Sequence, residues 1–582
     1  MTKYMDKGAH APSDGPEEDL WDRVRRGIIG GNAFIDTPFG RRRLTYADHT
    51  ASGRAITFIE DHIRACLELY GNTHSEDDAT GIATTERLRE AEASIKRLVN
   101  AGPEHKIIAV GAGTTAAVHH LQQILGIFIP PAGRDFFKRF LKDHFSAPEY
   151  DALVAGLLAV RPVVFVGPYE HHSNEVSWRE CFAEVVEIEL SPSGLLDLDD
   201  LQDKVTRKEY AGRKRIGAFS AASNVSGVTT PVYEVARILH KSGSLAFFDF
   251  AAAAPYVAID MRHDLDSFFD AIYFSPHKLL GGPGSSGILI FHQGIYRADL
   301  PPTVGAGGTV DFVDFKDQAY SADIETREKP GTPGIEQTLR AALAMELKES
   351  MGPARIQARE EELVRRVYAR LSTHTGLVLM GDVSPEHRLP IFSFNVRAGT
   401  AWLHPRFVTT LLNDLFGIQS RAGCSCAAPY GHRILHIDGR TSRELRRSIA
   451  CGNMGLKPGW VRVNFHFLHT EEEIDFICCA ILFVADQGKY FLPQYRFNMS
   501  SGAWNHTDFV PARVPFGIDD ALRAEESRGT FPAGQESDAA RLFDEYLREA
   551  ERRAVLARER WSESDLRKTE EDLIPFAYVT KA

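Results

Sequence analysis

The sequence has few cysteines for its length, seven in 582 residues, and their number is odd. Secreted domains that depend on disulfides carry many paired cysteines, so this sparse set excludes a disulfide framework. We therefore expect free thiols, a reducing compartment and a cytoplasmic location.

Long hydrophobic runs are also lacking. Charge or glycine interrupts the apolar stretches well before the ~20 residues that a membrane-spanning helix needs. The N-terminal region is polar and acidic, whereas a secretory signal is basic and then apolar. These two absences predict a chain without a membrane partner.

An excess of basic charge is the third absence. The formal net charge is -12, with 67 Lys and Arg against 79 Asp and Glu, so no basic face is expected for nucleic acid. The short run Arg41-Arg42-Arg43 does not change this, and we interpret it as a solvated turn. The remaining composition, 43% hydrophobic and 25% charged, is that of an ordinary globular protein.

The order of the predicted elements indicates the fold class. Short apolar runs, predicted as buried strands, alternate with helical segments such as residues 115–125 and 232–240. This alternation predicts an α/β fold with a mostly parallel sheet. The expected strands are residues 106–110, 163–166, 185–190, 216–219, 245–248, 271–274 and 287–291.

The length predicts two or more domains, because 582 residues exceed what one core usually organises. A helical insertion at residues 136–160 interrupts the series of strands. The amphipathic helix at 538–561 is interpreted as having a solvated charged face, with docking on the partner subunit as the alternative. The expected parts are an N-terminal arm (1–43), a large α/β domain (44–310) whose first segment contributes to the small domain, a small α+β domain (311–486), and a charged C-terminal extension (487–582).

A lysine lies just beyond one predicted strand, residues 271–274. Lys278 ends the sequence Ser275-Pro276-His277-Lys278, and a glycine-rich turn comes next. The carboxyl ends of parallel strands form the ligand-binding edge of α/β folds, and glycine lets the backbone approach a cofactor closely. A partly desolvated lysine forms Schiff bases with aldehydes. Most lysines lie on the surface, so this motif alone leaves the two interpretations evenly balanced.

A carboxylate ends the preceding predicted strand. Alone, Asp249 is a typical turn former. Together with Lys278 it predicts a site for pyridoxal 5′-phosphate (PLP), because a carboxylate beside the pyridine nitrogen keeps that ring protonated and electron-withdrawing.

A glycine-rich turn at residues 110–115 lies between a strand and a helix. Its free amides, with the hydroxyls of Thr114 and Thr115, suit a phosphate group. Many strand–helix turns look similar, so the signal is weak. Ser275 and His277 supply further hydrogen-bonding groups.

Two histidines, His171 and His172, follow the strand at residues 163–166. An imidazole at a strand end can stack on a cofactor ring and move protons. A metal site is the alternative, but no Cys/His spacing supports it, so we expect no metal.

Taken in order, these residues resemble the class V aminotransferase fold and, within it, the cysteine desulfurases. The resemblance covers about residues 44–482 and implies an aspartate aminotransferase-like PLP fold. No single motif decides it, but their number and order are specific for the fold. The matching segments are residues 46–52, 70–75, 113–115, 170–174, 223–227, Asp249, 275–278, 307–309 and 327–333.

The resemblance assigns roles to residues of this chain. Lys278 would form the Schiff base, Asp249 would pair with the pyridinium, and His171 would stack on the ring. Asn224 would lie beside cofactor and substrate, and Arg462 would bind the substrate carboxylate as a bidentate fork. The phosphate would be held by Thr114, Thr115, Ser275 and His277, with Thr309 reaching in from the second subunit of a homodimer.

The desulfurase-like feature is the loop from Arg421 to Pro429, which reads Arg-Ala-Gly-Cys-Ser-Cys-Ala-Ala-Pro. In the family, the thiol at the position of Cys426 takes sulfur from substrate cysteine, and Arg421 would supply positive charge near it. The resemblance thus implies L-cysteine as substrate, L-alanine and an enzyme persulfide as products, and a sulfur acceptor as partner. Simple packing, or a metal bound by Cys424 and Cys426, is the alternative role of these thiols.

One departure concerns the reaction type. The family usually has a glutamine, contacting the phenolic oxygen of the cofactor, where this chain has Ala252. Alanine cannot make that hydrogen bond, although molybdenum-cofactor sulfurases, which resemble this fold, also tolerate it. The alternatives are another class V reaction (C–S lyase, epimerase or aminotransferase) or a non-catalytic binding protein. The non-catalytic alternative is disfavoured, because the chain retains Lys278, Asp249, His171 and Arg462.

Overall fold

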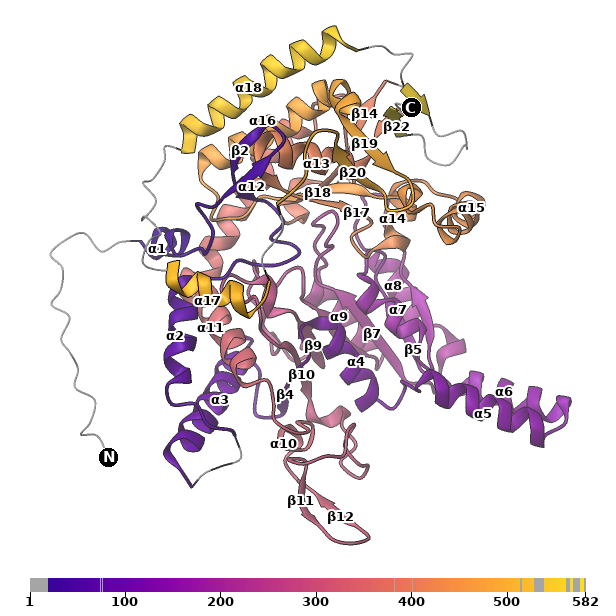
Figure 1. The fold of residues 1–582 in the computed structure, drawn as a ribbon. Helices are drawn as coiled ribbons and strands as arrows, with labels where there is room; N and C mark the ends of the chain where they lie inside the picture. Colours follow the sequence, from indigo (N-terminus) through magenta and orange to yellow (C-terminus); the bar gives the residue numbers. More distant parts are fainter. Residues whose placement is uncertain are drawn as a thin grey trace.

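A computed structural model of the chain (Figure 1) describes residues 19–73, 75, 77–381, 383–399, 401–512, 516–527, 539–561, 566–568 and 576–579. Of the expected N-terminal arm, residues 1–18 lie outside the described residues, as do several short segments of the C-terminal extension.

A seven-stranded sheet forms the centre of the larger half. From β9 to β6 the neighbouring strands are parallel, and β10 is antiparallel to both β4 and β9. Because β4 and β9 both oppose β10, their carboxyl ends lie at the same edge. The predicted α/β class with a mostly parallel sheet is therefore confirmed. The strand order is β4 (His105–Val110), β10 (Gly287–His292), β9 (Ala271–Phe274), β8 (Leu245–Asp249), β7 (Arg215–Ser220), β5 (Val163–Val166) and β6 (Glu184–Glu187).

Helices flank this sheet, because their apolar stripes must be buried against it. In α9, for example, Val235, Ala236 and Leu239 are buried on one face, the spacing of an amphipathic helix packed on a sheet. Strands between such layers are covered on both faces, which is why β5, β8 and β9 are nearly all apolar. These helices are α2 (Thr57–Leu67), α3 (Ala79–Leu98), α4 (Thr114–Ile124), α7 (Val176–Arg179), α8 (Leu198–Val205), α9 (Val232–Lys241), α10 (Ile324–Arg327) and α11 (Ile335–Met351).

A second sheet forms the core of the smaller half, which lies above the first in Figure 1. Its strand order is β17 (Arg421–Gly423), β18 (Trp460–Asn464), β14 (Ile391–Ala398), β15 (Ala401–Leu403), β22 (Phe576–Val579) and β21 (Leu566–Lys568), with β13 (Leu377–Leu379) paired to β14. The helices of this half are α12 (Pro353–Leu371), α13 (Pro405–Phe416), α14 (Ala428–Ile434), α15 (Gly439–Ala450) and α16 (Glu471–Gln487). A short parallel pair, β3 (Thr45–Tyr46) with β16 (Ile418–Gln419), ties the N-terminal segment to this half.

One stretch among the described residues, Glu471–Gln494, is long and apolar enough to cross a membrane by length and composition. It comprises α16 and the short helix after it, and 56% of its most apolar window is buried inside the protein. Ile474, Ile477 and Val484 belong to the core of the smaller half.

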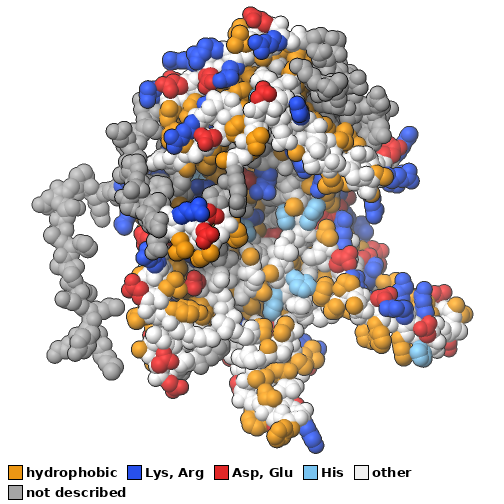
Figure 2. All heavy atoms as spheres, in the orientation of Figure 1, with side chains coloured by type: hydrophobic (Ala, Val, Ile, Leu, Met, Phe, Trp, Pro, Cys, Tyr) orange, Lys and Arg blue, Asp and Glu red, His pale blue; other side chains and the backbone are white. Residues whose placement is uncertain are grey.

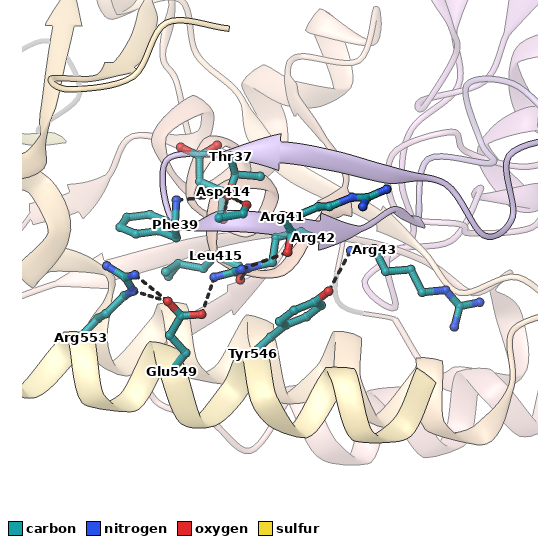
Figure 3. Close-up of polar contacts among 11 residues, drawn as sticks. Thr37, Phe39, Arg41, Arg42, Arg43, Asp414, Leu415, Tyr546, Glu549 and Arg553 are labelled. Atoms are coloured by element: carbon teal, nitrogen blue, oxygen red, sulfur yellow. Dashed lines mark hydrogen bonds and ion pairs between the residues drawn. The ribbon is translucent and has the colours of Figure 1, made fainter. Parts of the chain in front are cut away.

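Two segments from opposite parts of the sequence, residues 34–43 and 539–559, pack together on the smaller half. The hairpin of β1 (Phe34–Thr37) and β2 (Gly40–Arg43) lies against α18 (Ala539–Glu559), as Figure 3 shows. Arg42 is 3% exposed, donates to the carbonyl of Leu415 and pairs with Glu549 of α18 at 2.8 Å. The expectation of a solvated turn at Arg41-Arg42-Arg43 is therefore wrong, because the middle guanidinium finds buried partners.

Helix α18 is also more than a solvated charged face. Its apolar side contributes Phe543 and Tyr546 to the core of the smaller half, with Phe543 stacked on Phe476 at 4.1 Å between ring centroids. The sequence indicated the charged face of α18, and the structure shows that the opposite, apolar face covers the core of the smaller half.

Two elements project from the body (Figure 1). The expected insertion is a helical hairpin of α5 (Pro131–His144) and α6 (Ala147–Val160), in which no residue is buried. The second is the β-hairpin of β11 (Val310–Val313) and β12 (Gln318–Tyr320). Figure 2 shows hydrophobic side chains exposed on both projections.

Candidate active site

A cavity of about 670 Å³ lies where the carboxyl ends of the central strands meet the smaller half. Figure 2 shows a hollow on this face with histidine and basic side chains in it. Of the residues predicted for the site, all but Thr309 line this cavity. They are Lys278, Asp249, Thr114, Thr115, His171, Asn224, Ser275, His277, Arg421, Cys426 and Arg462.

Lys278 follows β9 in a single helical turn, Pro276–Lys278. Burial lowers the pKa of its amine to about 8, partly offset by the negative charge of Asp249. Arg462 and Arg421 lower the pKa further. The amine is therefore more readily deprotonated, and more nucleophilic at neutral pH, than an exposed lysine.

Asp249 ends β8 and is 3% exposed. Burial raises the pKa of its carboxyl to about 6, opposed by the Ala251 amide, which donates to it at 2.8 Å, and by the charge of Lys278. A positive group beside this carboxylate would favour its ionised form, because burial is what disfavours the charge.

The turn between β4 and α4 forms a cradle. The Thr114 amide donates to Ser275 Oγ at 2.8 Å, and His277 Nδ1 contacts the Ala112 carbonyl at 2.9 Å. A Cβ built on Gly113 would lie 2.9 Å from Ser275 Oγ and 3.1 Å from His277 Cε1, so any side chain there would fill the cradle. Together with the start of α4, these neutral donors fit a phosphate group. The Lys278 amine fits the aldehyde of PLP, and the Asp249 carboxylate fits its ring nitrogen.

His171 is held by its neighbours. Its Nδ1 accepts from the Ser173 amide at 3.1 Å and contacts the Ser173 hydroxyl at 3.0 Å. Burial, with a smaller contribution from Lys278, lowers its pKa to about 3, so the ring is a neutral imidazole. Glu170 anchors the same loop, because its buried carboxyl group accepts from Ser220 and Gly167.

Asp48 lies between the two arginines and was not among the predicted site residues. Its carboxylate meets Arg462 at 2.8 Å and Arg421 at 2.9 Å. Arg462 also donates to the Asn224 carbonyl at 3.1 Å, and among the described residues its Nε has no partner. A substrate carboxylate would therefore have to share these arginines with Asp48 or displace it.

Cys426 is an exposed thiol on a tightly held loop. Ser425 and Cys426 both have left-handed backbones, with φ of 50° and 55°, an uncommon state for non-glycine residues. The Cys426 carbonyl accepts from the His172 amide, and the Ser425 carbonyl accepts from Asn224, each at 2.7 Å. His172 Nε2 in turn accepts from the Ala428 amide at 3.1 Å. Hydrogen bonds from distant segments of the same chain thus hold the strained turn that exposes the Cys426 thiol.

Two predicted positions differ in outcome. Ala252 lines the cavity and offers only a methyl group there. Thr309 is fully buried away from the cavity in this chain, where its hydroxyl donates to the Ala306 carbonyl at 2.7 Å. Its contribution from a second subunit stays a prediction.

The region of residues 153–477 matches the aminotransferase class-V family. A "probable cysteine desulfurase" of Halalkalibacterium halodurans is 27% identical over 403 residues, covering 68% of this chain and 87% of that protein. Another from Halobacterium salinarum is 28% identical, covering 70% and 90% respectively.

Solved structures show the same fold. The apo cysteine desulfurase of Thermococcus onnurineus superposes with a TM-score of 0.61 at 22% identity, over 80% of this chain and 98% of that one. The cysteine desulfurase CsdA of Escherichia coli gives a TM-score of 0.55 at 21% identity, over 76% and 94%.

Proposed function

This chain belongs to the aminotransferase class-V family, and we propose that it is a PLP-dependent cysteine desulfurase. In the reaction, L-cysteine and the Cys426 thiol yield L-alanine and a Cys426 persulfide. The substrate C–S bond breaks and an S–S bond forms, so no external oxidant is needed.

The residues that would hold the cofactor follow from the cavity. Lys278 would carry it, Asp249 would face its ring nitrogen, and Thr114, Thr115, Ser275 and His277 would hold its phosphate. When bound, PLP supplies an electron sink that stabilises negative charge at the substrate α-carbon.

The chain's own groups perform the remaining work. Arg462 and Arg421 bind the substrate carboxylate, in competition with Asp48. The Lys278 amine, whose pKa burial lowers to about 8, takes up the α-proton and later returns a proton to the product. His171, neutral because burial depresses its pKa, can accept or donate a proton near the leaving sulfur. The Cys426 thiolate attacks that sulfur.

One observation carries the proposal: an amine, a thiol and a carboxylate-binding arginine line the same cavity, as Lys278, Cys426 and Arg462. The amine and the arginine are common to many amino-acid enzymes, whereas an exposed thiol on a held loop supports sulfur transfer. The curated relatives named as cysteine desulfurases support the same reaction.

The test is to incubate the PLP-loaded protein with L-cysteine and to measure alanine and, after reduction, sulfide. Equal amounts of the two are expected. Cys426→Ala should lower alanine formation about 100-fold or more while the absorbance of the bound cofactor stays unchanged. The matched control is Cys451→Ala, because Cys451 is also exposed but does not line the cavity.

Other products would contradict the proposal. Pyruvate and sulfide without alanine would indicate a C–S lyase, racemised substrate would indicate an epimerase, and amino transfer to a keto acid would indicate an aminotransferase. Alanine formation that survives Cys426→Ala would exclude the persulfide step.

A further inference from the structure

A second cavity, of about 510 Å³, lies outside the proposed active site. It is bounded by α1 (Leu20–Arg26), the segment from Arg43 to Arg54, and the first turns of α16 and α18. The two cavities share no lining residue. Between them runs the segment that carries Asp48: its neighbour His49 lines the second cavity and Thr50 the first, and Asp48 pairs with Arg421 and Arg462.

Positive charge gathers in this cavity although the chain as a whole has a net charge of -12. Four guanidinium groups line it, against the two carboxylates of Glu472 and Glu473. Glu473 is already engaged, because it accepts from the Thr470 amide at the start of α16. The lining arginines are Arg25, Arg26, Arg43 and Arg54.

Two of these arginines keep their charge uncompensated. Within the described part of the chain, Arg43 and Arg54 donate only to neutral oxygens, Arg43 to Asn32 at 3.1 Å and Arg54 to the Ile29 carbonyl at 2.6 Å. Arg54 also lies over the Tyr46 ring at 4.9 Å. In Figure 3, the Arg43 guanidinium lies on the far side of Tyr546 from Glu549, so it does not share the ion pair of Arg42.

A buried imidazole belongs to the same cavity. His49 is 4% exposed, and its ring stacks on His466 at 4.0 Å between centroids. Among the described residues, its Nδ1 has no hydrogen-bond partner. Burial and the neighbouring His466, His469 and Arg54 hold the pKa of His49 well below its usual range, so it is a neutral imidazole.

We propose that this cavity binds a small metabolite that carries a phosphate or diphosphate group, with Arg43 and Arg54 as the principal contacts. Guanidinium groups bind phosphate oxygens through paired, charge-assisted hydrogen bonds. The volume is within the range of small-molecule sites. More than one arginine without a carboxylate partner favours a multivalent anion over a simple carboxylate.

The experiment is an isothermal titration of the PLP-loaded protein with inorganic pyrophosphate. The cofactor's own phosphate then occupies the cradle at Thr114, and the variants at Arg43 and Arg54 distinguish binding in the second cavity from binding at Arg421 and Arg462. We expect one binding site, weakened about tenfold or more in Arg43→Gln and in Arg54→Gln, because each loses charge-assisted hydrogen bonds. Arg446→Gln is the matched control, since that arginine is exposed on α15 and should leave the affinity unchanged.

The cofactor absorbance and the melting temperature establish that each variant is folded. Arg43 is half-exposed, so Arg43→Gln decides the question if Arg54→Gln does not fold. Pyrophosphate affinity equal to the parent protein in the folded variants would overturn the proposal, as would no binding at all. Citrate binding as tightly as pyrophosphate would overturn the assignment to phosphate.

Discussion

At the scale of single residues, Lys278 shows how burial prepares a side chain for chemistry. Burial lowers the pKa of its amine to about 8, against about 10.5 for an exposed lysine. The neutral amine is the form that attacks an aldehyde. We therefore predict that the rate at which the apoprotein incorporates PLP rises with pH up to about 8 and then levels off.

The measurement is the rate of appearance of the cofactor absorbance between pH 6 and 10. Lys278→Ala is the control and should give no stable band. A rate that still climbs steeply from pH 8 to 10 would mean that the amine has an ordinary pKa.

Asp48 gives a second prediction at this scale. It is 8% exposed and holds the 3% exposed Arg462, so Asp48→Ala leaves a buried guanidinium uncompensated. Breaking such a pair from one side costs about 3 kcal/mol or more in the free energy of unfolding. Urea denaturation measures it, with Glu444→Ala as control, because the pair of Glu444 with Arg440 is exposed. A loss below about 1 kcal/mol would show that Arg462 is stable without Asp48.

The sequence predicts some site residues well and others not at all. Lys278 and Asp249 could be predicted because Asp249 ends one apolar strand and Lys278 follows the end of the next, and parallel strands bring such ends together. The partnership of Asp48 with Arg462 could not, because 414 residues separate them and it depends on how the two halves meet. A motif identifies a residue, and only the fold identifies its partner.

At the scale of elements, the loop that carries Cys426 depends on His172. The imidazole accepts the Ala428 amide proton, and the His172 backbone amide binds the Cys426 carbonyl. We predict that His172→Ala lowers the turnover of cysteine about tenfold, because an amide without its acceptor loosens the strained turn. The cofactor absorbance should stay the same.

The rate of Cys426 alkylation by iodoacetamide provides a readout besides activity, and it should change in His172→Ala. His144→Ala is the control, since His144 lies on the projecting α5. An unchanged alkylation rate and turnover would show that the other bonds suffice to hold the loop.

Helix α18 yields a prediction about stability. Phe543 is 3% exposed and stacks on Phe476, whereas Leu556 on the same helix is 55% exposed. Phe543→Ala should lower the free energy of unfolding by about 3 kcal/mol or more, and Leu556→Ala by no more than about 0.5 kcal/mol. Chemical denaturation of both variants tests this. Equal effects would mean that α18 does not pack as described.

Helix α18 could be predicted from its periodicity, but the surface against which it packs could not. The apolar positions Phe543, Tyr546, Ala550 and Ala554 follow one stripe, which requires some apolar surface to cover. That surface includes Phe39, more than 500 residues earlier. Local pattern determines that a helix forms, and tertiary packing determines where it lies.

At the scale of the whole molecule, the α5–α6 hairpin stands apart from both cores. None of its residues is buried, and its ion pair with the body, between Arg134 and Glu180, is exposed. Such pairs contribute about 0–1 kcal/mol. Replacing residues 131–160 by a short glycine–serine linker should therefore move the melting temperature by no more than about 2 °C. Differential scanning calorimetry measures this, and a large loss of stability would mean that the hairpin supports the fold.

The contact between Arg42 and Glu549 also has a consequence for biosynthesis. The two residues are 507 positions apart, and ribosomes add about 5–20 residues per second, so Arg42 waits about 25–100 s for its partner. Until then the β1–β2 hairpin and the apolar surface under α18 remain uncovered. The central sheet, whose last strand ends at His292, can form before α18 has been synthesised, whereas the smaller half is completed only once α18 is available. During that interval, apolar side chains that α18 later covers are open to aggregation and chaperone binding.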